Sequence, residues 1–338
     1  DMAKSRGLGD VYKRQTLPDV NIYLSSGATG DITVSDKIRQ LFTMTGSESF
    51  GSNSGMTVMF LTANQNRLGY VDFTTPPASS GGLSVLNSHV YRPGQITMTV
   101  SADGRAFWGG NNTSEPFNTW KNGTGVSELV DDNEDYPGRD STVAHTDGRV
   151  FWGADTKLFT WKESTGLTTI KSFEADIGRD AIVVSGTGRA FFGQDTGITS
   201  DFWTWAEGTN LSTIVSGRYS AGVDAIAVTP NDRVFFGDDS PTSVFWTWRA
   251  STGLSGLVSD GSRAGYLSTI ASTDNRGFFG EFAGGSRKYY TWSEADGLSV
   301  LISGLNYPGR ECAIAGTSGR IYFCDWASSS AEYYTWKN

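Results

Sequence analysis

The chain has 338 residues, of which 42 are glycine, 13% are aromatic and only 19% are charged. This composition suits short strands joined by tight turns, so we predict an all-β protein with almost no helix. The formal net charge is −9, and an acidic body repels phosphate backbones and anionic lipid, so we expect no nucleic-acid partner. No apolar run reaches the length of a membrane span, and we expect no membrane insertion.

Residues 1–15 are set apart from the rest of the chain. Within them, residues 5–15 match the in-frame translation of a common transposase sequencing adapter, and we interpret them as a remnant at the end of an assembled, metagenomic contig. We expect residues 1–15 to be disordered and exclude them from fold reasoning. A genuine basic arm is the alternative. Loss of the four basic and two acidic residues in this stretch moves the net charge from −9 to −11, and the absence of a signal peptide then carries no information.

Residues 16–338 form an array of internal repeats, which we predict to be a single domain. An arginine recurs at intervals of 38 to 44 residues, a period typical of propeller blades. Each copy contains four segments of strand character, named a to d in chain order. The arginine marks seven copies: Arg67, Arg105, Arg149, Arg189, Arg233, Arg276 and Arg320.

The array begins with a half copy and an irregular first copy. Residues 20–34 parallel the c and d segments of later copies, whereas the last copy ends after its segment c. A strand from this half copy would complete the last blade and close the ring. In the first full copy we assign residues 66–71 to segment b. Pro76 and Pro77 then replace the strand that should follow, because proline cannot serve an inner ladder position.

In the later copies the four segments differ in composition. Segment a is small and apolar, as at residues 181–184, and ends in a tight glycine turn. Segment b carries two neighbouring aromatic residues, such as Phe151 and Trp152, which point to opposite faces of a sheet. Segment c contains a Thr-Trp pair, as at Trp161, and segment d follows another glycine turn. Sheets that are apolar on both faces must stack, which predicts a seven-bladed β-propeller of four-stranded antiparallel blades, closed by an N-terminal strand that completes the last blade.

The best-formed copy resembles the repeats of TolB-type and WD-repeat-like propellers, which pair an Asp-Gly turn and an aromatic strand with a second aromatic strand and a Thr-Gly turn. Residues 224–248 are also similar to the extracellular HAF-type repeat, and residues 103–109 resemble the repeat of the chromatin-condensation regulator. The resemblance covers about residues 20–338 and implies a propeller. It carries over no active-site residue, because segment c lacks the Trp-Asp pair of true WD repeats and the regulator's later glycine-rich loop is missing. The motif residues are Asp147-Gly148-Arg149, Phe151, Phe159-Thr160-Trp161 and Thr165-Gly166-Leu167.

We interpret the recurring arginines and the Thr-Trp tryptophans as structural. An arginine directly after the a-to-b turn is placed to cap turn carbonyls or to pair with a neighbouring blade. A ring of ligand contacts is the alternative. We interpret the tryptophans as core anchors.

The candidate binding site is built from a Gly-Arg-acid motif that recurs directly before segment a. Because segment a is the innermost strand of a blade, these charges should ring one mouth of the central channel, where they would suit a hydroxylated ligand or a protein loop. Inter-blade Arg–Asp pairing that satisfies loop amides is the alternative. The motif supplies Arg139, Asp140, Arg179, Asp180, Arg310 and Glu311, with Asp224 in a partial copy. The b-to-c loops add Asp155, Asp195, Asp238 and Asp325, and Trp326 could stack on a sugar ring.

Catalysis, metals and cofactors have little support in the sequence. His89 and His145 lie in unrelated segments of different copies, so they indicate neither a nucleophile–base pair nor a metal site. Carboxylate pairs could hydrolyse glycosides, but every loop contains carboxylates. Residues 131–135 are acidic and could bind calcium weakly, although such a run is also typical of a solvated loop. We predict no cofactor.

Cys312 and Cys324 lie symmetrically about the turn of the last a–b hairpin. They should therefore face each other across two antiparallel strands, and we predict a disulfide between them. Two buried free thiols are the alternative. A disulfide indicates an oxidising compartment.

These observations favour a bacterial or phage-associated binding module, extracellular, on the cell surface or in the periplasm, that recognises a glycan or a protein. A propeller enzyme acting on polysaccharide, as a glycosidase or a lyase, is one alternative. An interaction domain of a larger protein is another.

Overall fold

In the computed structural model, the residues that the structure describes are 21–22, 32–33, 38–43, 57–62, 68–72, 84–87 and 98–337, the last range with gaps at 111–115, 131–135, 173–175, 196–198, 239–242, 260–262, 282–286, 317–318 and 327–330. Before Met98 the description covers strand pairing alone. The adapter-like residues 1–15 and the acidic run 131–135 lie outside the described residues.

The chain falls into two compact units, Asp1–Pro137 and Gly138–Asn338, which are described separately. All regular structure in the described residues is β-strand, as the composition predicted, and none of it is helical. The single domain predicted for residues 16–338 stays a prediction.

The first unit contains a short hairpin and two four-stranded antiparallel sheets, with strands in the orders β1-β2, β3-β4-β5-β6 and β10-β9-β8-β7. Their bounds are β1 Asn21–Ile22, β2 Ile32–Thr33, β3 Ile38–Thr43, β4 Thr57–Thr62, β5 Leu68–Asp72, β6 Ser84–Asn87, β7 Met98–Val100, β8 Ala106–Trp108, β9 Phe117–Lys121 and β10 Gly125–Val130.

One prediction for this unit was wrong. Leu68–Asp72, assigned to the second strand of its copy, forms the third strand, because Thr57–Thr62 pairs with both Ile38–Thr43 and Leu68–Asp72 and so occupies the second place. The sequence of β4, Thr-Val-Met-Phe-Leu-Thr, is rich in β-branched and aromatic residues, which fits an inner strand.

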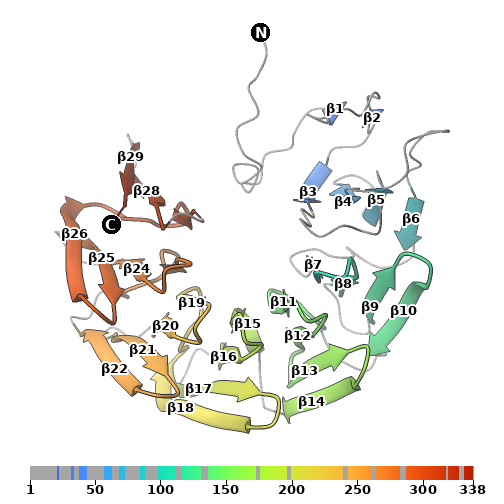
Figure 1. Ribbon diagram of the computed structural model, residues 1–338, viewed down its shortest axis with the longest axis horizontal. Helices are drawn as coiled ribbons and strands as arrows, with labels where there is room; N and C mark the ends of the chain where they lie inside the picture. The colour runs from blue at the N-terminus through green and yellow to red at the C-terminus, as the bar shows by residue number, and fades with distance from the viewer. Residues whose placement is uncertain are drawn as a thin grey trace. The chain divides into compact units, whose positions relative to one another are not determined.

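The second unit contains four four-stranded antiparallel sheets in which chain order equals spatial order, followed by a sheet of three described strands. Figure 1 shows these sheets one after another, with the first strand of each on the inside and the fourth on the outside. The first sheet is β11 Thr142–Ala144, β12 Val150–Gly153, β13 Lys157–Lys162 and β14 Gly166–Ser172; the second is β15 Ile177–Val184, β16 Ala190–Gln194, β17 Thr199–Ala206 and β18 Asn210–Tyr219. The third is β19 Ile226–Val228, β20 Val234–Gly237, β21 Phe245–Arg249 and β22 Gly253–Val258; the fourth is β23 Ile270–Ala271, β24 Gly277–Gly280, β25 Arg287–Ser293 and β26 Gly297–Leu305.

The last sheet consists of β27 Ile314–Ala315, β28 Ile321–Trp326 and β29 Ala331–Trp336, without a fourth strand among the described residues. This agrees with the expectation that the last copy stops after segment c. In the structure Ile32–Thr33 pairs with Asn21–Ile22. Completion of the last sheet by an N-terminal strand, and a total of seven blades, remain predictions.

Aromatic side chains hold successive sheets of the second unit together. The first aromatic residue of the second strand, such as Phe151, is fully buried and meets the Thr-Trp tryptophan of the following sheet edge to face, here Trp205 with ring centroids 5.6 Å apart. The same pairing recurs in Phe191–Trp248, Phe235–Trp292 and Phe278–Trp336. Edge-to-face geometry is the arrangement that aromatic quadrupoles favour.

The recurring arginines contact the same tryptophans. The guanidinium of Arg149 lies over the ring of Trp205 and also pairs with Glu207, which follows in the next turn of that sheet. Arg233 is 3% exposed, lies 4.5 Å from the ring centroid of Trp292 and forms an ion pair with Glu294. Arg189 and Arg276 lie over the corresponding rings of Trp248 and Trp336. These contacts support the structural interpretation of the arginines and tryptophans.

The threonine before the tryptophan bonds to the neighbouring strand of its own sheet in four copies. The hydroxyl of Thr160 donates a hydrogen bond of 3.1 Å to the carbonyl oxygen of Val150 on the neighbouring strand. The same bond forms from Thr119, Thr204 and Thr247.

A glycine ends the second strand of most copies because the next sheet approaches it closely. A Cβ atom at Gly193 would lie 1.9 Å from the carbonyl oxygen of Ala221, and one at Gly153 would lie 2.0 Å from that of Ile177. No side chain fits at such distances, so the glycine sets the spacing between sheets. In the last copy Cys324 stands at this position.

Candidate functional site

The predicted residues of the Gly-Arg-acid motif lie at or just before the first strand of each sheet. Five such segments in the second unit, residues 138–140, 178–180, 222–224, 265–267 and 309–311, are here called the loop ladder. Four of them precede the first strand, whereas residues 178–180 lie within β15, where its pairing with β16 shifts register. The glycine of the loop anchors it to the second strand of its own copy. Gly138 N donates to the Gly153 carbonyl at 2.6 Å, and Gly309 N donates to the Cys324 carbonyl at 2.7 Å.

Backbone hydrogen bonds join the last residue of each loop to the loop before it. The amide of Asp180 donates to the carbonyl oxygen of Asp140 at 2.8 Å, and the amide of Asp224 donates to that of Asp180 at 2.8 Å. The series continues from Leu267 to Asp224 and from Glu311 to Leu267, each at 2.6 Å. Five residues from five copies are thus fixed in a row by their main chain.

The five residues share one backbone conformation. Their φ angles are 49° at Asp140 and Asp180 and 51° at Asp224, Leu267 and Glu311, all in the left-handed region. Aspartate enters this region more readily than leucine or glutamate. The structure therefore brings together all four acids predicted from the Gly-Arg-acid motif, and it adds Leu267, which the motif search missed because this copy has no charge there.

Asp180 lies in the most negative part of the ladder. Burial, together with the charges of Asp140 and Asp224, raises the pKa of Asp180 to about 7, against the opposing effect of Arg179. Burial also raises the pKa of Asp140, although Arg179 and Arg139 act to lower it. The repulsion among these carboxyl groups would be relieved by a ligand that donates hydrogen bonds or carries positive charge.

Arg179 is the central cation of the ladder. Its guanidinium donates a hydrogen bond of 3.2 Å to Asp176 and lies 4.0 Å from the carboxylates of Asp140, Asp180 and Asp195. These contacts support the alternative interpretation of Arg179, in which it pairs with acidic residues, because its single positive charge lies near four carboxylates. Asp176 was not predicted, and its only sequence signal is its place three residues before an arginine.

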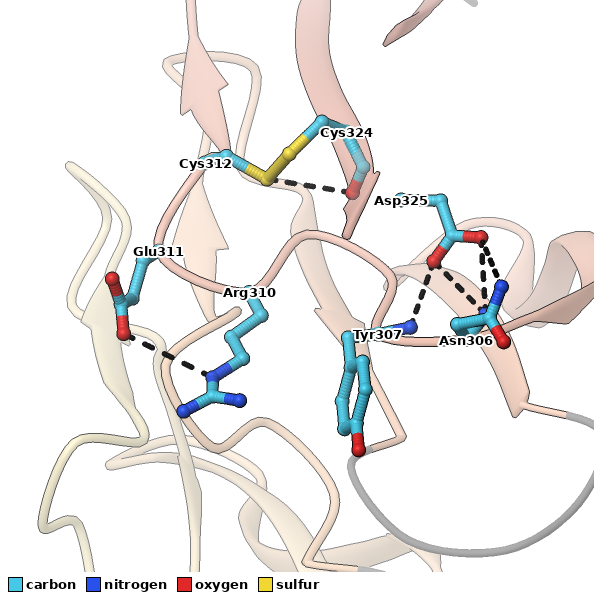
Figure 2. Close-up of a disulfide and its surroundings, with 7 residues drawn as sticks. All are labelled: Asn306, Tyr307, Arg310, Glu311, Cys312, Cys324 and Asp325. Carbon is cyan, nitrogen blue, oxygen red and sulfur yellow. Dashed lines mark hydrogen bonds and ion pairs between the residues drawn. A yellow bond between two sulfur atoms is a disulfide. The ribbon is translucent and has the colours of Figure 1, made fainter. Parts of the chain in front are cut away.

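The last copy holds its ladder residues differently. Figure 2 shows Arg310, whose guanidinium lies 3.9 Å from the Glu311 carboxylate and 5.5 Å from the ring centroid of Tyr307. Beside them, Asp325 accepts hydrogen bonds from the amides of Asn306 and Tyr307 and from the Asn306 side chain. Asp325 is buried and therefore acts as a loop cap.

The other predicted residues of the b-to-c loops differ in their surroundings. Asp195 lies close to Arg179 and also accepts a 3.3 Å hydrogen bond from the Ser220 hydroxyl. Asp238 is buried and accepts from the amide of Val244, so it too caps a loop. Asp155 is half-buried in the turn between β12 and β13. Trp326 ends β28, but its side chain lies outside the described residues.

The described part of the chain contains no group of three or more histidine, cysteine or acidic side chains placed to hold a metal ion. Within it, no helix is long and apolar enough to cross a membrane. His145 binds Asp147 and the carbonyl of Gly186 at the a-to-b turns, at the end of the sheets opposite the ladder, while His89 lies outside the described residues.

Cys312 and Cys324 form a disulfide, as predicted. Cys312 directly follows the last ladder residue, and Cys324 precedes the loop cap Asp325, so the bond joins the ladder to β28 (Figure 2).

No protein-family model matches the chain. No curated protein matches it either. Among solved structures, a eukaryotic initiation factor is similar with a TM-score of 0.56 at 10% identity, over 86% of this chain and 71% of that one. Together with the repeated four-stranded sheets, this likeness shows the fold predicted from the repeats. The chain is a β-propeller.

Two further solved structures are similar to this propeller at lower scores. Virginiamycin B lyase from Staphylococcus aureus has a TM-score of 0.48 at 13% identity, over 71% of this chain and 85% of that one. TolB from Acinetobacter baumannii has a TM-score of 0.40 at 10% identity, over 89% of this chain and 76% of that one. At these identities the likeness concerns the fold alone.

Proposed function

We propose that this propeller is a binding module that recognises a glycan or a protein through the loop ladder. The observation that carries the proposal is the row of main-chain hydrogen bonds from Asp140 to Glu311, which fixes the backbone of one residue from each of five copies. Polar groups held on a rigid backbone are pre-organised for binding, because little conformational entropy is lost when a ligand arrives.

The charges of the ladder favour a ligand rich in hydrogen-bond donors. The charges of Asp140 and Asp224 act unfavourably on the Asp180 carboxylate, and Arg179 is the cation shared by Asp140 and Asp180. Saccharide hydroxyls, or amide and amine groups of a protein loop, can donate to such carboxylates. A phosphate or another polyanion would meet repulsion at the same place.

A glycan array probed with the wild-type protein and with an Arg179→Ala, Asp180→Ala double variant tests the proposal. We expect binding to particular glycans that is lost in the double variant. Glu207→Gln is the matched control, because Glu207 lies in a turn at the opposite end of its sheet and pairs with Arg149. If no glycan binds, a protein partner is favoured, and co-purification with the same three proteins tests it. Binding that the double variant retains would exclude the ladder as the site.

A second candidate function, hydrolysis or elimination on a polysaccharide, is favoured by one observation. A carboxyl group with a pKa of about 7, as at Asp180, can donate a proton near neutral pH, and Asp140 and Asp224 supply neighbouring carboxylates. Product release from a polysaccharide panel distinguishes this function from binding. An enzyme would lose product formation in Asp180→Asn while still binding the polymer, whereas a binding module would release no product in either form.

We infer an extracellular, cell-surface or periplasmic location. The disulfide between Cys312 and Cys324 supports it, because such bonds persist in oxidising compartments. Alkylation of the non-reduced protein, followed by mass measurement, tests the bond itself: two alkylated cysteines would contradict it.

A further inference from the structure

The disulfide occupies a position where two other copies of the second unit use a serine and a glycine, and two use an alanine and a glycine. In the first sheet of the second unit, Gly153 N donates to the Ser141 hydroxyl at 3.0 Å, and this hydroxyl donates to the Gly153 carbonyl at 3.2 Å. Ser268 and Gly280 form the same pair of bonds at 3.0 and 3.4 Å. Each serine directly follows a ladder residue, as Cys312 follows Glu311, and each glycine ends the second strand at the position of Cys324.

Hydrogen bonds also attach the last loop of the ladder to its own sheet. Gly309 N donates to the Cys324 carbonyl, and Asp325 accepts from the amides of Asn306 and Tyr307, so these bonds all end on two adjacent residues of β28. On the other side of the loop, β27 has only two residues, and Ile314 in it is 56% exposed. The covalent bond at Cys312 is thus the strongest tie between the ladder residues and the sheet that carries them.

We propose that the Cys312–Cys324 disulfide is a redox-dependent clasp that positions Arg310 and Glu311 and thereby regulates the ligand site of the loop ladder. The regulatory part rests on the proposed binding function, whereas the clasp itself does not. Cys312 is half-buried and Cys324 is 7% exposed, so Cys312 is the more exposed of the two residues.

The reductant is a dithiol. One of its thiolates attacks the Cys312 sulfur, the S–S bond breaks, and Cys324 leaves as a thiolate that takes up a proton. The second thiol of the reductant then attacks the mixed disulfide and releases Cys312 as a thiol. The reductant ends as a disulfide, and two electrons and two protons have passed to the protein.

Reduction should loosen the loop because two thiols cannot reproduce the serine–glycine pair. A thiol is a weak donor and a weak acceptor, whereas the serine hydroxyl both accepts from and donates to the glycine backbone. Two unbonded sulfur atoms also need more room than a disulfide, at a position where other copies have only a hydrogen atom in place of one side chain. The freed loop would carry Arg310 and Glu311 away from their fixed places.

Hydrogen exchange measured by mass spectrometry on the full chain tests the clasp without any ligand. With dithiothreitol as the dithiol, we expect amide exchange in residues 307–316 to rise at least about tenfold, equivalent to about 1.4 kcal/mol of local opening. Residues 263–272, the corresponding loop of the preceding copy, should not change. An unchanged rate at 307–316 after alkylation has confirmed reduction overturns the proposal, and so does an equal rise in both segments, which would indicate general unfolding.

A matched variant separates the redox effect from loss of fold. Cys312→Ser with Cys324→Gly recreates the pair seen at Ser141 and Gly153, so we expect this variant to fold. Its amides at residues 307–316 should exchange as slowly as those of the oxidised protein, and dithiothreitol should not change their rate. If the amides of residues 307–316 in this variant exchange as fast as in the reduced wild type, the serine–glycine pair does not replace the disulfide.

Ligand binding then tests the regulatory part. A glycan or protein found with the array should bind the reduced wild type at least about tenfold more weakly than the oxidised form, with no redox effect on the Ser–Gly variant. Equal affinity of the two wild-type forms overturns regulation. Absence of any ligand, with the exchange difference intact, overturns the proposed function while the clasp itself stands.

Discussion

The guanidinium carbon of Arg149 lies 5.2 Å from the ring centroid of Trp205, a residue of the following sheet. Phe151, two residues after Arg149, meets the same ring edge to face. Four Arg-x-Phe motifs of the second unit are therefore completed by the tryptophan of the next copy, and the motif recurs there because each sheet packs against its neighbour. Stability in this propeller is accordingly shared between neighbouring copies.

Replacement of Trp205 by alanine should lower the free energy of unfolding by about 3–5 kcal/mol, because it removes a large ring that packs against Phe151 and Arg149. Urea denaturation measures the change. Leu167→Ala is the control, since Leu167 is 43% exposed and should cost no more than about 0.5 kcal/mol. A cost below about 1 kcal/mol at Trp205 would contradict its role as an anchor between sheets.

Replacement of Gly193 by alanine should cost about 1–3 kcal/mol or more, because the new Cβ would lie 1.9 Å from the Ala221 carbonyl and would push two sheets apart. Gly256 is the control. A Cβ there would meet its nearest neighbour at 3.4 Å, an ordinary contact, so Gly256→Ala should change stability by less than about 0.5 kcal/mol. Equal thermal stability of the two variants would show that close approach does not explain the strand-end glycines.

The pH dependence of stability should reveal Asp180. Its folded pKa of about 7 exceeds the ordinary value of 3.8, so its contribution to stability is full below about pH 4 and is lost as the pH rises through 7. The Asp180→Asn variant lacks this titration. Between pH 4 and 8 the wild type should therefore lose about 1–2 kcal/mol relative to the variant, a figure reduced for screening because the side chain is 37% exposed. Urea midpoints that differ by a constant amount at all pH values would argue against the raised pKa.

Asp147 should show the opposite pH dependence. Burial acts to raise its pKa, but hydrogen bonds from Lys162, His145 and the Arg149 amide outweigh burial and lower the pKa to about 2. Its contribution is thus present above about pH 4 and is lost as the pH falls through 2. Asp147→Asn should be less stable than the wild type by about 1 kcal/mol at pH 7, because the side chain is 34% exposed and its ion pair with Lys162 is screened.

Acid titration of both proteins, followed by circular dichroism, measures this difference. The two curves should converge near pH 2. If the difference persists to that pH, the loss at Asp147→Asn comes from a cause other than its charge.

Several features could be predicted from the sequence because they repeat or pair locally. The aromatic pair at Phe151 and Trp152 requires a sheet buried on both faces, and its recurrence implies stacked sheets. The disulfide followed from two cysteines placed symmetrically about a hairpin turn, where strand register determines which side chains face each other.

Other features depend on contacts between copies, which a linear motif does not contain. Leu267 occupies the same backbone position as Asp224 but shares none of its chemistry, so only the hydrogen bonds reveal it. Asp325 was predicted to face a ligand, but its carboxylate accepts hydrogen bonds from the amides of Asn306 and Tyr307. The first copy was misassigned because Arg67 matched the motif, whereas the pairing of β4 decides the register.

In the loop ladder, the same backbone arrangement holds residues with different side chains. Since the connecting bonds run from amide to carbonyl, the structure already accommodates aspartate, leucine and glutamate at φ angles between 49° and 51° without a change of backbone. Each copy thus offers one position at which the side chain can change while the main-chain hydrogen bonds stay the same. At the proposed ligand site, a single-residue substitution in one copy would therefore change the side chain presented to a ligand and leave the backbone of the other copies in place.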